Sequence, residues 1–291
     1  MMPLLKQVMG MTLVVAAMTI TTPGRAWVQG TSRDSASRSN TPVVPPGSTS
    51  VAPGSTSATD ARARGPLPFG VGEQLTYTVA VGGAKVGTGK MELLGIEDVR
   101  GQPTFHSYFN VQGGFLMFKV NDVLESWFDT TTLSSRRFIQ RISEVNYKRE
   151  RHYDIYPSRA VFQQDTLPEE PSVAEPLDDA SFMYFVRTVP LVVGQTYTFD
   201  RYFRPDRNPV IVKVLRKERV KVPAGTFNTV VIQPIIKSQG IFADGGEAQM
   251  WLTDDDRRMM VQFKAKVPYL KTLDLYLQSY RPPTNASAGR Q

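Results

Sequence analysis

The sequence predicts an all-β domain, built as a duplicated antiparallel sheet with one short connecting helix. Apolar and polar residues alternate with a period of two from about residue 66 to 280, as in "EQLTYTVAV", where Leu75, Tyr77, Val79 and Val81 share one face. Clusters of Gly, Pro, Asn and Asp separate these runs, and similar segments recur in the same order along the chain. Such alternation is typical of antiparallel strands with one face packed and the other wetter.

The first part of the chain resembles an export signal followed by a tether. Residues 1–26 contain a lysine near the start, an apolar stretch over 8–20 and small residues before the end, which predicts a cleaved signal peptide. The apolar stretch is shorter than the roughly 20 residues that a membrane-spanning helix needs. Residues 27–65 are rich in Ser, Thr, Pro and Gly and are predicted to be disordered. We therefore expect a periplasmic or secreted protein, with a flexible tail over 281–291.

Composition excludes several classes of function. The chain has no cysteine, which excludes a disulfide scaffold, a thiol nucleophile, a thiolate metal site and a lipid-modified cysteine. The net charge of +7 is spread along the chain, whereas nucleic-acid binding usually requires a concentrated basic face. We expect no nucleic-acid partner, and no transmembrane segment in the mature chain.

The first run of strands continues through "TFHSYFNV", and the later strands through "VIVKVLRKERVKV", "MVQFKAKV" and "TLDLYLQSY". Between them, "LDDASFMYFVRTVP" breaks the alternation and predicts an amphipathic helix over 179–189. Asp178 or Asp179 would be its N-cap and Pro190 would end it. We expect the apolar stripe of this helix to pack on the sheet as core: Phe182, Phe185, Val186 and Val189.

The segments on either side of this helix resemble each other. "VGEQLTYTV" matches "VGQTYTFD", and "GQPTFHSYFNVQ" matches "AGTFNTVVIQP". "ESWFDTTTLSSRRFIQR" from Glu125 matches "QMWLTDDDRRMMVQFKA" from Gln249. Because the order is preserved, we predict two copies of one β-rich unit, at about 68–165 and 190–280, within a domain spanning 66–280.

This duplication bears on the three consecutive aspartates over 254–256. The matching segments share a polar turn, an arginine pair and an apolar strand, whereas the aspartate triplet occurs in one copy only. Aspartate favours turns, and the triplet lacks the ligand spacing of a calcium loop. We predict a turn and not a metal site. Trp127 and Trp251 are predicted to be core residues that hold the two turns in register.

We find no constellation that supports catalysis, and we predict neither a cofactor nor a metal. His106 and His152 are the only histidines, and neither has a second histidine at a metal-binding spacing. Glu125 and Asp129 could pair as acid and base, but such a pair is weakly specific. No nucleophile elbow, Walker loop or dinucleotide fingerprint is present.

The segment "GGAKVGTGK" contains glycines and lysines but lacks the residue order of a phosphate-binding loop. It lies between predicted strands. Gly87 and Gly89 are therefore expected to mark a bend or a close approach of the backbone.

An apolar run interrupts the alternation at "GGFLMFKV", with a weaker counterpart in "QGIFADGG". Two interpretations stay open. The run is either a hairpin buried on both sides, or a hydrophobic lip at the mouth of a curved sheet that contacts lipid or an apolar partner. The candidate lip residues are Phe115, Leu116, Met117, Phe118, Ile241 and Phe242.

The densest positive patch is "YKRERHYDIY", where charged and aromatic residues alternate. A solvated strand face explains this pattern. Lys148, Arg149 and Arg151 are the candidate residues if that face binds another protein or the cell-wall polymer.

Several of these segments resemble one family. "FGVGEQLTYTV", "DDASFMYFVRTVPL", "VKVPAGTFNTVVIQP" and "MWLTDDDRRMMVQFKAKVP" are similar to the landmarks of bacterial exported proteins catalogued as domain of unknown function 3108, from about Pro68 to Leu277. The resemblance implies a strongly curved half-barrel, similar to periplasmic lipoprotein carriers, with helical cover on the concave side. It implies no activity. Met259 and Met260 stand where the family often has a proline after the basic pair, which makes this strand more apolar.

Three hypotheses follow. The first is a non-enzymatic periplasmic protein that binds a lipid or another apolar envelope component in the groove of a curved sheet. The second is an envelope interaction module that binds a protein or the cell-wall polymer through its polar strand face. The third, a hydrolase that uses Glu125, Asp129 or the aspartate turn, ranks well below both.

Overall fold

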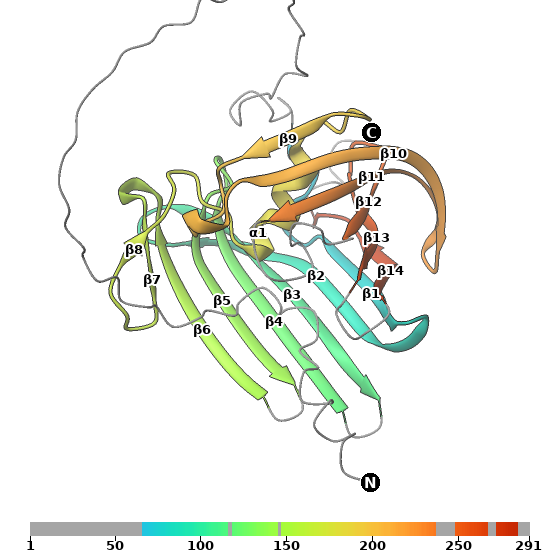
Figure 1. Ribbon diagram of the computed structural model, residues 1–291, viewed down its shortest axis with the longest axis horizontal. Helices are drawn as coiled ribbons and strands as arrows, with labels where there is room; N and C mark the ends of the chain where they lie inside the picture. Colours follow the sequence, from blue (N-terminus) through green and yellow to red (C-terminus); the bar gives the residue numbers. More distant parts are fainter. Residues whose placement is uncertain (1–65, 116–117, 145–146, 237–247, 267–271, 285–291) are drawn as a thin grey trace, which may run out of the picture.

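The computed structural model describes residues 66–115, 118–144, 147–236, 248–266 and 272–284. Over these residues the chain forms one antiparallel sheet of fourteen strands (Figure 1). The predicted signal peptide and tether lie outside the described residues, as does most of the predicted tail. Over the described part of the chain, no helix has the length and the apolar character that crossing a membrane requires.

The first half of the sheet comes from residues before the helix. Its strands are β1 (Gln74–Val81), β2 (Ala84–Asp98), β3 (Pro103–Phe115), β4 (Phe118–Asp129), β5 (Ser135–Glu144), β6 (Tyr147–Tyr156), β7 (Val161–Gln164) and β8 (Glu170–Pro171). A single 3-10 turn, η3 (Pro157–Arg159), precedes β7.

The second half follows the helix. Its strands are β9 (Thr196–Phe199), β10 (Val210–Val222), β11 (Gly225–Ile236), β12 (Gln249–Thr253), β13 (Met260–Ala265) and β14 (Leu273–Arg281), and the 3-10 turn η5 (Pro205–Arg207) precedes β10.

Within each half, strands that are neighbours in the sequence are neighbours in the sheet, and the two halves join where β1 pairs with β14. Gln74 lies opposite Arg281 in that pair. The strands β8 and β9 form the two edges, so the sheet is not closed. It bends strongly, and its halves face each other across the helix (Figure 1). The predicted all-β, curved half-barrel is confirmed.

The helix α1 (Asp179–Phe185) lies on the concave face, where it contacts β3 and β4. Asp178 is its N-cap, as predicted, and forms a capping box with Ser181. The α-helix ends earlier than residue 189 because its continuation tightens into the 3-10 turn η4 (Val186–Thr188).

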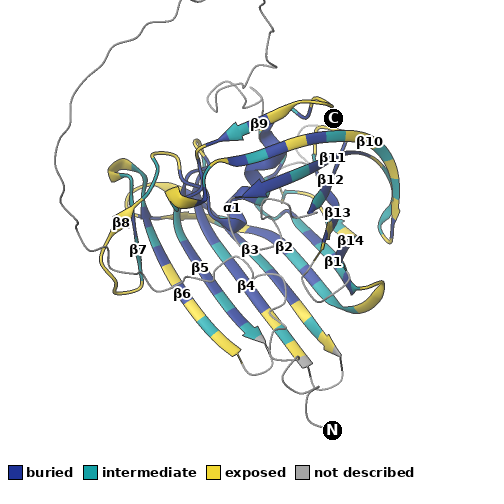
Figure 2. Ribbon diagram, viewed as in Figure 1, coloured by how far each residue is buried: buried dark blue, intermediate teal, exposed yellow. Residues whose placement is uncertain are grey.

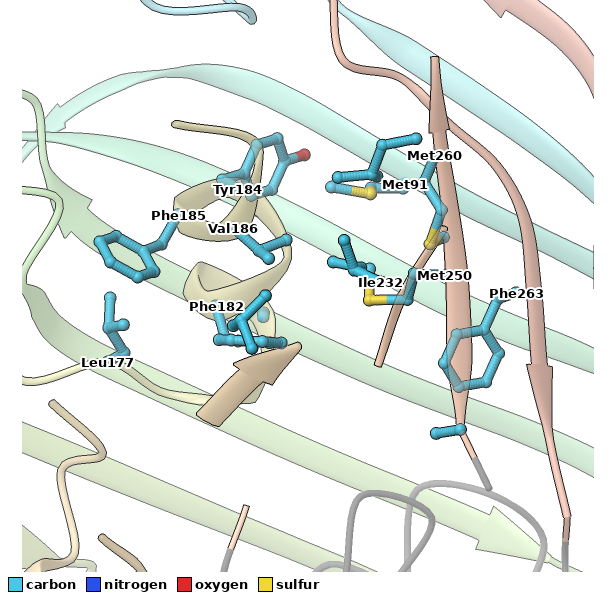
Figure 3. Packing of buried hydrophobic residues seen from close by; sticks show 14 of the residues in the cluster. Met91, Leu177, Phe182, Tyr184, Phe185, Val186, Ile232, Met250, Met260 and Phe263 are labelled. Carbon is cyan, nitrogen blue, oxygen red and sulfur yellow. The ribbon is translucent and has the colours of Figure 1, made fainter. Parts of the chain in front are cut away.

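The helix is less amphipathic in its surroundings than the sequence predicts. Every residue of α1 except Met183 is buried, since the bent sheet surrounds it on more than one side (Figures 2 and 3). Figure 3 shows Phe182 and Val186 on the side of the helix that faces Ile232 and Met250. The predicted core role of the apolar stripe is confirmed, because Phe182, Phe185, Val186 and Val189 are all buried.

The second half supplies a continuous apolar wall on the concave face. One row of directly paired residues crosses six strands, from β1 through β14 to β10, and every member is buried: Val79, Leu275, Phe263, Met250, Ile232 and Val214. Burying one such side chain contributes about 1.5–3 kcal/mol, so this row is a large part of the core.

The two halves share local contacts as well as strand order. The Trp127 indole N–H donates to Glu97, and the Trp251 indole N–H donates to Glu218. The hydroxyl groups of Thr104 and Thr229 donate to the backbone carbonyls of these same two glutamates, at 2.7 Å in both cases. These matching contacts support the predicted repeats at about 68–165 and 190–280, which remain a prediction.

Candidate functional site

The strands β3 to β6 continue beyond α1 toward their hairpin ends (Figures 1 and 2). Side chains on the concave face of this extension form rows of directly opposed residues. The row nearest the helix contains Phe109, Leu124, Gln140 and Arg151. The next row toward the hairpin ends contains Val111, Asp122, Ile142 and Arg149.

Three polar residues of these two rows are buried: Asp122, Gln140 and Arg151. We call them the concave polar cluster. They come from three adjacent strands, β4, β5 and β6, and they occupy positions whose neighbours along each strand are core residues. Leu124 and Ile142, for example, belong to the main hydrophobic core. The cluster is therefore a polar island on an apolar surface.

Gln140 is the most unusual member of the cluster. Its side chain is 1% exposed, yet neither its amide nitrogen nor its amide oxygen has a hydrogen-bond partner among the described residues. Burying an unsatisfied polar group costs about 1–3 kcal/mol. Most buried polar atoms in folded proteins have partners, so such an exception calls for a functional or structural explanation.

Asp122 is buried beside Gln140, one row closer to the hairpin ends. Its Oδ1 accepts a hydrogen bond from the Ser143 backbone N–H at 3.0 Å, whereas its Oδ2 has no partner within the described part of the chain. Burial raises the pKa of this carboxyl to about 7, and the Ser143 bond offsets only part of that effect. Asp122 therefore changes charge near neutral pH.

Arg151 lies directly opposite Gln140 on β6 and is buried. This burial corrects the predicted polar face of Lys148, Arg149 and Arg151. Successive residues of a strand point to opposite faces. Lys148 therefore lies exposed on the convex face, while Arg149 and Arg151 lie on the concave face, half-buried and buried respectively.

The corresponding part of the second half carries no such polar residues. The concave positions of β13 are Val261, Phe263 and Ala265, and all three are buried. A strand in this environment is therefore stable with apolar residues alone. The polar cluster is a feature of the first half that the architecture does not require.

The convex face carries a separate network around His106. Its Nδ1 lies 2.9 Å from Glu97 and its Nε2 lies 2.9 Å from Glu125, an arrangement that an imidazolium satisfies with both N–H groups. The ring also stacks on Trp127 at 4.1 Å between centroids. The bonds from Trp127 and His106 lower the pKa of Glu97.

Trp127 and Trp251 are both buried, as predicted, but they do not share one core. Trp251 belongs to the main cluster, whereas Trp127 packs with Val99 and Ile139 in a small second cluster on the convex face.

The structure does not bring Glu125 and Asp129 together as an acid–base pair. Glu125 accepts from His106 and Arg141. Asp129 instead accepts at one oxygen from the backbone N–H groups of the turn that follows it, Thr131 and Thr132, and at the other from Arg136. His152 is exposed and contacts Glu150.

The aspartates at 254–256 lie in the turn between β12 and β13, as predicted. Asp255 accepts from the Thr253 hydroxyl at 2.6 Å and from Arg257, while Asp254 pairs with Lys217 at 2.7 Å. Among the residues that the structure describes, no group of three or more His, Asp or Glu side chains could hold a metal ion.

The predicted lip lies at the hairpin that joins β3 to β4. Phe115 ends β3, Phe118 begins β4, and the two are directly paired. Their side chains lie outside the described part of the structure, as do the residues Leu116, Met117, Ile241 and Phe242. The assignment of these six residues as a lip stays a prediction.

Sequence reasoning missed Asp122 and Gln140, although the signal was present. Asp122 falls on the same alternating positions as Leu124 in "NDVLESWF", and Gln140 lies between Phe138 and Ile142 in "RRFIQRIS". Both are polar residues on the apolar stripe of a strand. Such a residue is a candidate site residue because burying it has a cost.

Comparisons with known proteins place the chain in a family and a fold. Residues 76–278 match the family described as protein of unknown function (DUF3108). Among solved structures, the chain is similar to a beta-barrel-like protein of domain of unknown function DUF1849 from Brucella abortus, with 9% identity and a TM-score of 0.50 over 75% of this chain and 99% of that one. No curated protein matches the chain.

Two further solved structures match less closely. One is a candidate lipoprotein from Parabacteroides distasonis, with 10% identity and a TM-score of 0.33 over 74% of this chain and 98% of that one. The other is a candidate exported protein with a YmcC-like fold from Bacteroides fragilis, with 11% identity and a TM-score of 0.28 over 76% and 99%. At these identities the matches bear on the fold alone.

Proposed function

We propose that this chain, which belongs to the DUF3108 family of proteins of unknown function, is a non-enzymatic periplasmic protein that binds a lipid or another apolar envelope component. The ligand would lie against the concave face of the sheet. The observation that carries the proposal is the concave polar cluster, which places buried polar atoms without protein partners on an apolar surface. An amphipathic ligand would satisfy both parts of that surface.

The apolar part of the surface supports the binding of a hydrocarbon chain. Beside the polar cluster, β3 and β4 present Phe109, Val111 and Leu124. The opposite half presents the apolar wall of β10 to β14. Burying an acyl chain contributes about 0.8 kcal/mol per CH₂, so a chain that is only partly covered is still retained.

The periplasmic location rests on the predicted signal peptide over 1–26 and the predicted tether over 27–65. A protein that carries an apolar molecule across an aqueous compartment needs a surface that shields this molecule from water. The bent sheet offers one on its concave face.

The alternative, an interaction module that uses a polar strand face, receives less support. It relied on Lys148, Arg149 and Arg151 on one face, and two of these residues lie on the concave side instead. No described feature identifies a partner protein or polymer for that face.

Native mass spectrometry of the full chain, purified from the periplasm without detergent and followed by organic extraction, tests the proposal. A discrete additional mass that resolves into a lipid would support it. A protein of unmodified mass that is well folded by circular dichroism would contradict it. Salt-sensitive retention of that protein by envelope material would then favour the interaction module.

A further inference from the structure

We infer that the concave polar cluster binds the anionic end of an acyl lipid, a carboxylate or phosphate group, and that the apolar part of the same face holds the acyl chain. This inference rests on the proposed function. It adds the chemistry of the headgroup and the residues that recognise it.

Arg151 supplies the positive charge. Its guanidinium stays protonated throughout the physiological pH range and presents N–H groups in a planar fork that matches a carboxylate or a phosphate. Its side chain is 2% exposed, and an oxyanion bound in so buried a position interacts more strongly than it would in water.

Gln140 supplies further hydrogen bonds beside that charge. It lies directly opposite Arg151 on the neighbouring strand, where Cβ atoms are about 5 Å apart. Both polar atoms of its amide lack partners among the described residues, so its NH₂ group is available to an oxyanion. Two donors of this kind, on adjacent strands and at the same level, can contact one headgroup together.

Asp122 defines the boundary of the headgroup position toward the hairpin ends. On the neighbouring strands β3, β5 and β6, the charged side chains described on its face are Arg149 and Arg151. Burial favours the neutral carboxylic acid, which can donate one hydrogen bond through the oxygen that no described residue contacts. A neutral Asp122 therefore tolerates an anionic ligand, whereas an ionised one would repel it.

The acyl chain has an apolar path from this headgroup position. Along β4 the concave positions Leu124 and Val120 lead to Phe118 at the hairpin, with Asp122 between them. The six residues from Leu124 to Phe118 span about 20 Å of extended strand, which suits a long acyl chain. The predicted lip lies at the end of this path.

The test uses the full chain and displacement of the fluorescent fatty acid cis-parinaric acid. The competitors are dodecanoate, dodecyl phosphate and dodecanol, which share one alkyl chain and differ in their headgroup. We expect the two anionic competitors to bind about tenfold or more tightly than dodecanol, as hydrogen bonds to charged groups would allow. Calorimetry with inorganic phosphate, which has no chain, should detect no comparable binding.

The variants separate the cluster from the rest of the protein. In Arg151→Met we expect the preference for dodecanoate over dodecanol to fall to about one, with dodecanol binding unchanged, because only the charge is lost. Lys148→Met removes the same charge from the convex face of the same strand and should keep the full preference. Gln140→Leu should reduce the preference by a smaller factor, and it serves if Arg151→Met does not fold.

Each other outcome overturns a defined part. Equal binding of dodecanoate and dodecanol by the wild type, or a preference that survives both Arg151→Met and Gln140→Leu, would overturn the headgroup site and leave lipid binding in place. Binding of inorganic phosphate as tight as that of dodecyl phosphate would replace the lipid headgroup with a free anion. Failure to bind cis-parinaric acid and every alkyl competitor would overturn the headgroup site and the proposed function together.

Discussion

Arg187, at the end of the helical segment, and Glu73, just before β1, form an ion pair in which neither side chain is exposed. Two N–H···O bonds of 2.7 and 2.9 Å join them. The same guanidinium donates to the backbone carbonyls of Pro68 and Arg257, both at 2.9 Å. One side chain thus ties the helix to the start of the sheet and to the turn between β12 and β13.

Removing one partner of this pair should cost more than removing both. Arg187→Met leaves the Glu73 carboxylate buried without its counter-charge, and we expect a loss of about 3–5 kcal/mol in the free energy of unfolding. The double variant Glu73→Gln with Arg187→Met should lose clearly less. Urea denaturation measures both, with Arg159→Met, from an exposed pair with Glu169, as a control near zero. Similar losses for the buried and exposed arginines would contradict this prediction.

Asp178 should be essential for docking α1. Its Oδ1 accepts from the N–H groups of Ala180 and Ser181, and its Oδ2 accepts from the hydroxyls of Ser126 and Ser135. Asp178→Ala leaves these donors buried and unpaired, so we expect a loss of about 3 kcal/mol in unfolding free energy. The exposed turn residue Asp256 provides the matched control, and Asp256→Ala should change stability by about 0.5 kcal/mol or less.

Asp122 should make stability depend on pH. Its folded pKa of about 7 lies above the value of about 3.9 for an unfolded aspartate, so the folded state binds more protons between these values. Its contribution to stability is complete below about pH 4 and is lost as the pH rises through about 7, by up to about 1.4 kcal/mol per pH unit.

Asp122→Asn should remove this dependence while keeping an oxygen acceptor for the Ser143 N–H. Urea denaturation at pH 5 and pH 8 should therefore show the variant gaining about 2–3 kcal/mol relative to the wild type between the two conditions. Asp254→Asn, on the exposed turn, should show no such gain. A wild type and an Asp122→Asn variant with parallel pH profiles would rule out a buried, titrating Asp122.

Gly113 should tolerate no side chain. A Cβ atom there would lie 2.4 Å from the Val86 carbonyl oxygen and 2.7 Å from the Gly87 Cα. Gly113→Ala forces β2 and β3 apart, and we expect a loss of at least about 2 kcal/mol. At Gly89 the nearest atom would be 3.5 Å away, so Gly89→Ala should have a smaller effect. Thermal unfolding compares the two variants, and equal changes would show that the strands separate easily.

The predicted lip can be tested without altering the polar cluster. Replacing Phe115 and Phe118 with Ser should abolish retention of the co-purified ligand and leave the fold intact, because the acyl chain would lose its apolar contacts. Leu94→Ser and Ile96→Ser are suitable controls, since both residues are exposed and apolar but lie on β2, away from the hairpin. Native mass spectrometry measures retention, and unchanged retention in the Phe variant would reject the lip.

Local patterns along the chain predicted features that depend on a few neighbouring residues. The alternation around Leu75 and Tyr77 predicted β1, and Asp178 was recognised as a helix cap because its side chain bonds to amides two and three residues later. The glycine segment was partly correct. Gly87 does mark a close backbone approach, with a Cβ position 2.2 Å from the Gln112 carbonyl oxygen, whereas Gly89 has ordinary space around it.

Other features required the register between distant strands. Alternation within "YKRERHYDIY" shows that Lys148 and Arg151 point to opposite faces, but the sequence pattern does not say which face is concave. The complete burial of α1 also depends on the bend that brings β11 to β13 over it.

By itself, the sequence determined the strands, the turns, the capped helix and the class of fold, because these follow from side-chain periodicity and local hydrogen bonding. Only the tertiary structure decided that Asp122, Gln140 and Arg151 share one buried surface, and that β1 joins β14 to make a single sheet. The physical reason is that hydrophobic alternation sets which face of each strand is buried. The pairing register sets which residues meet there, and it arises from contacts between strands far apart in the chain.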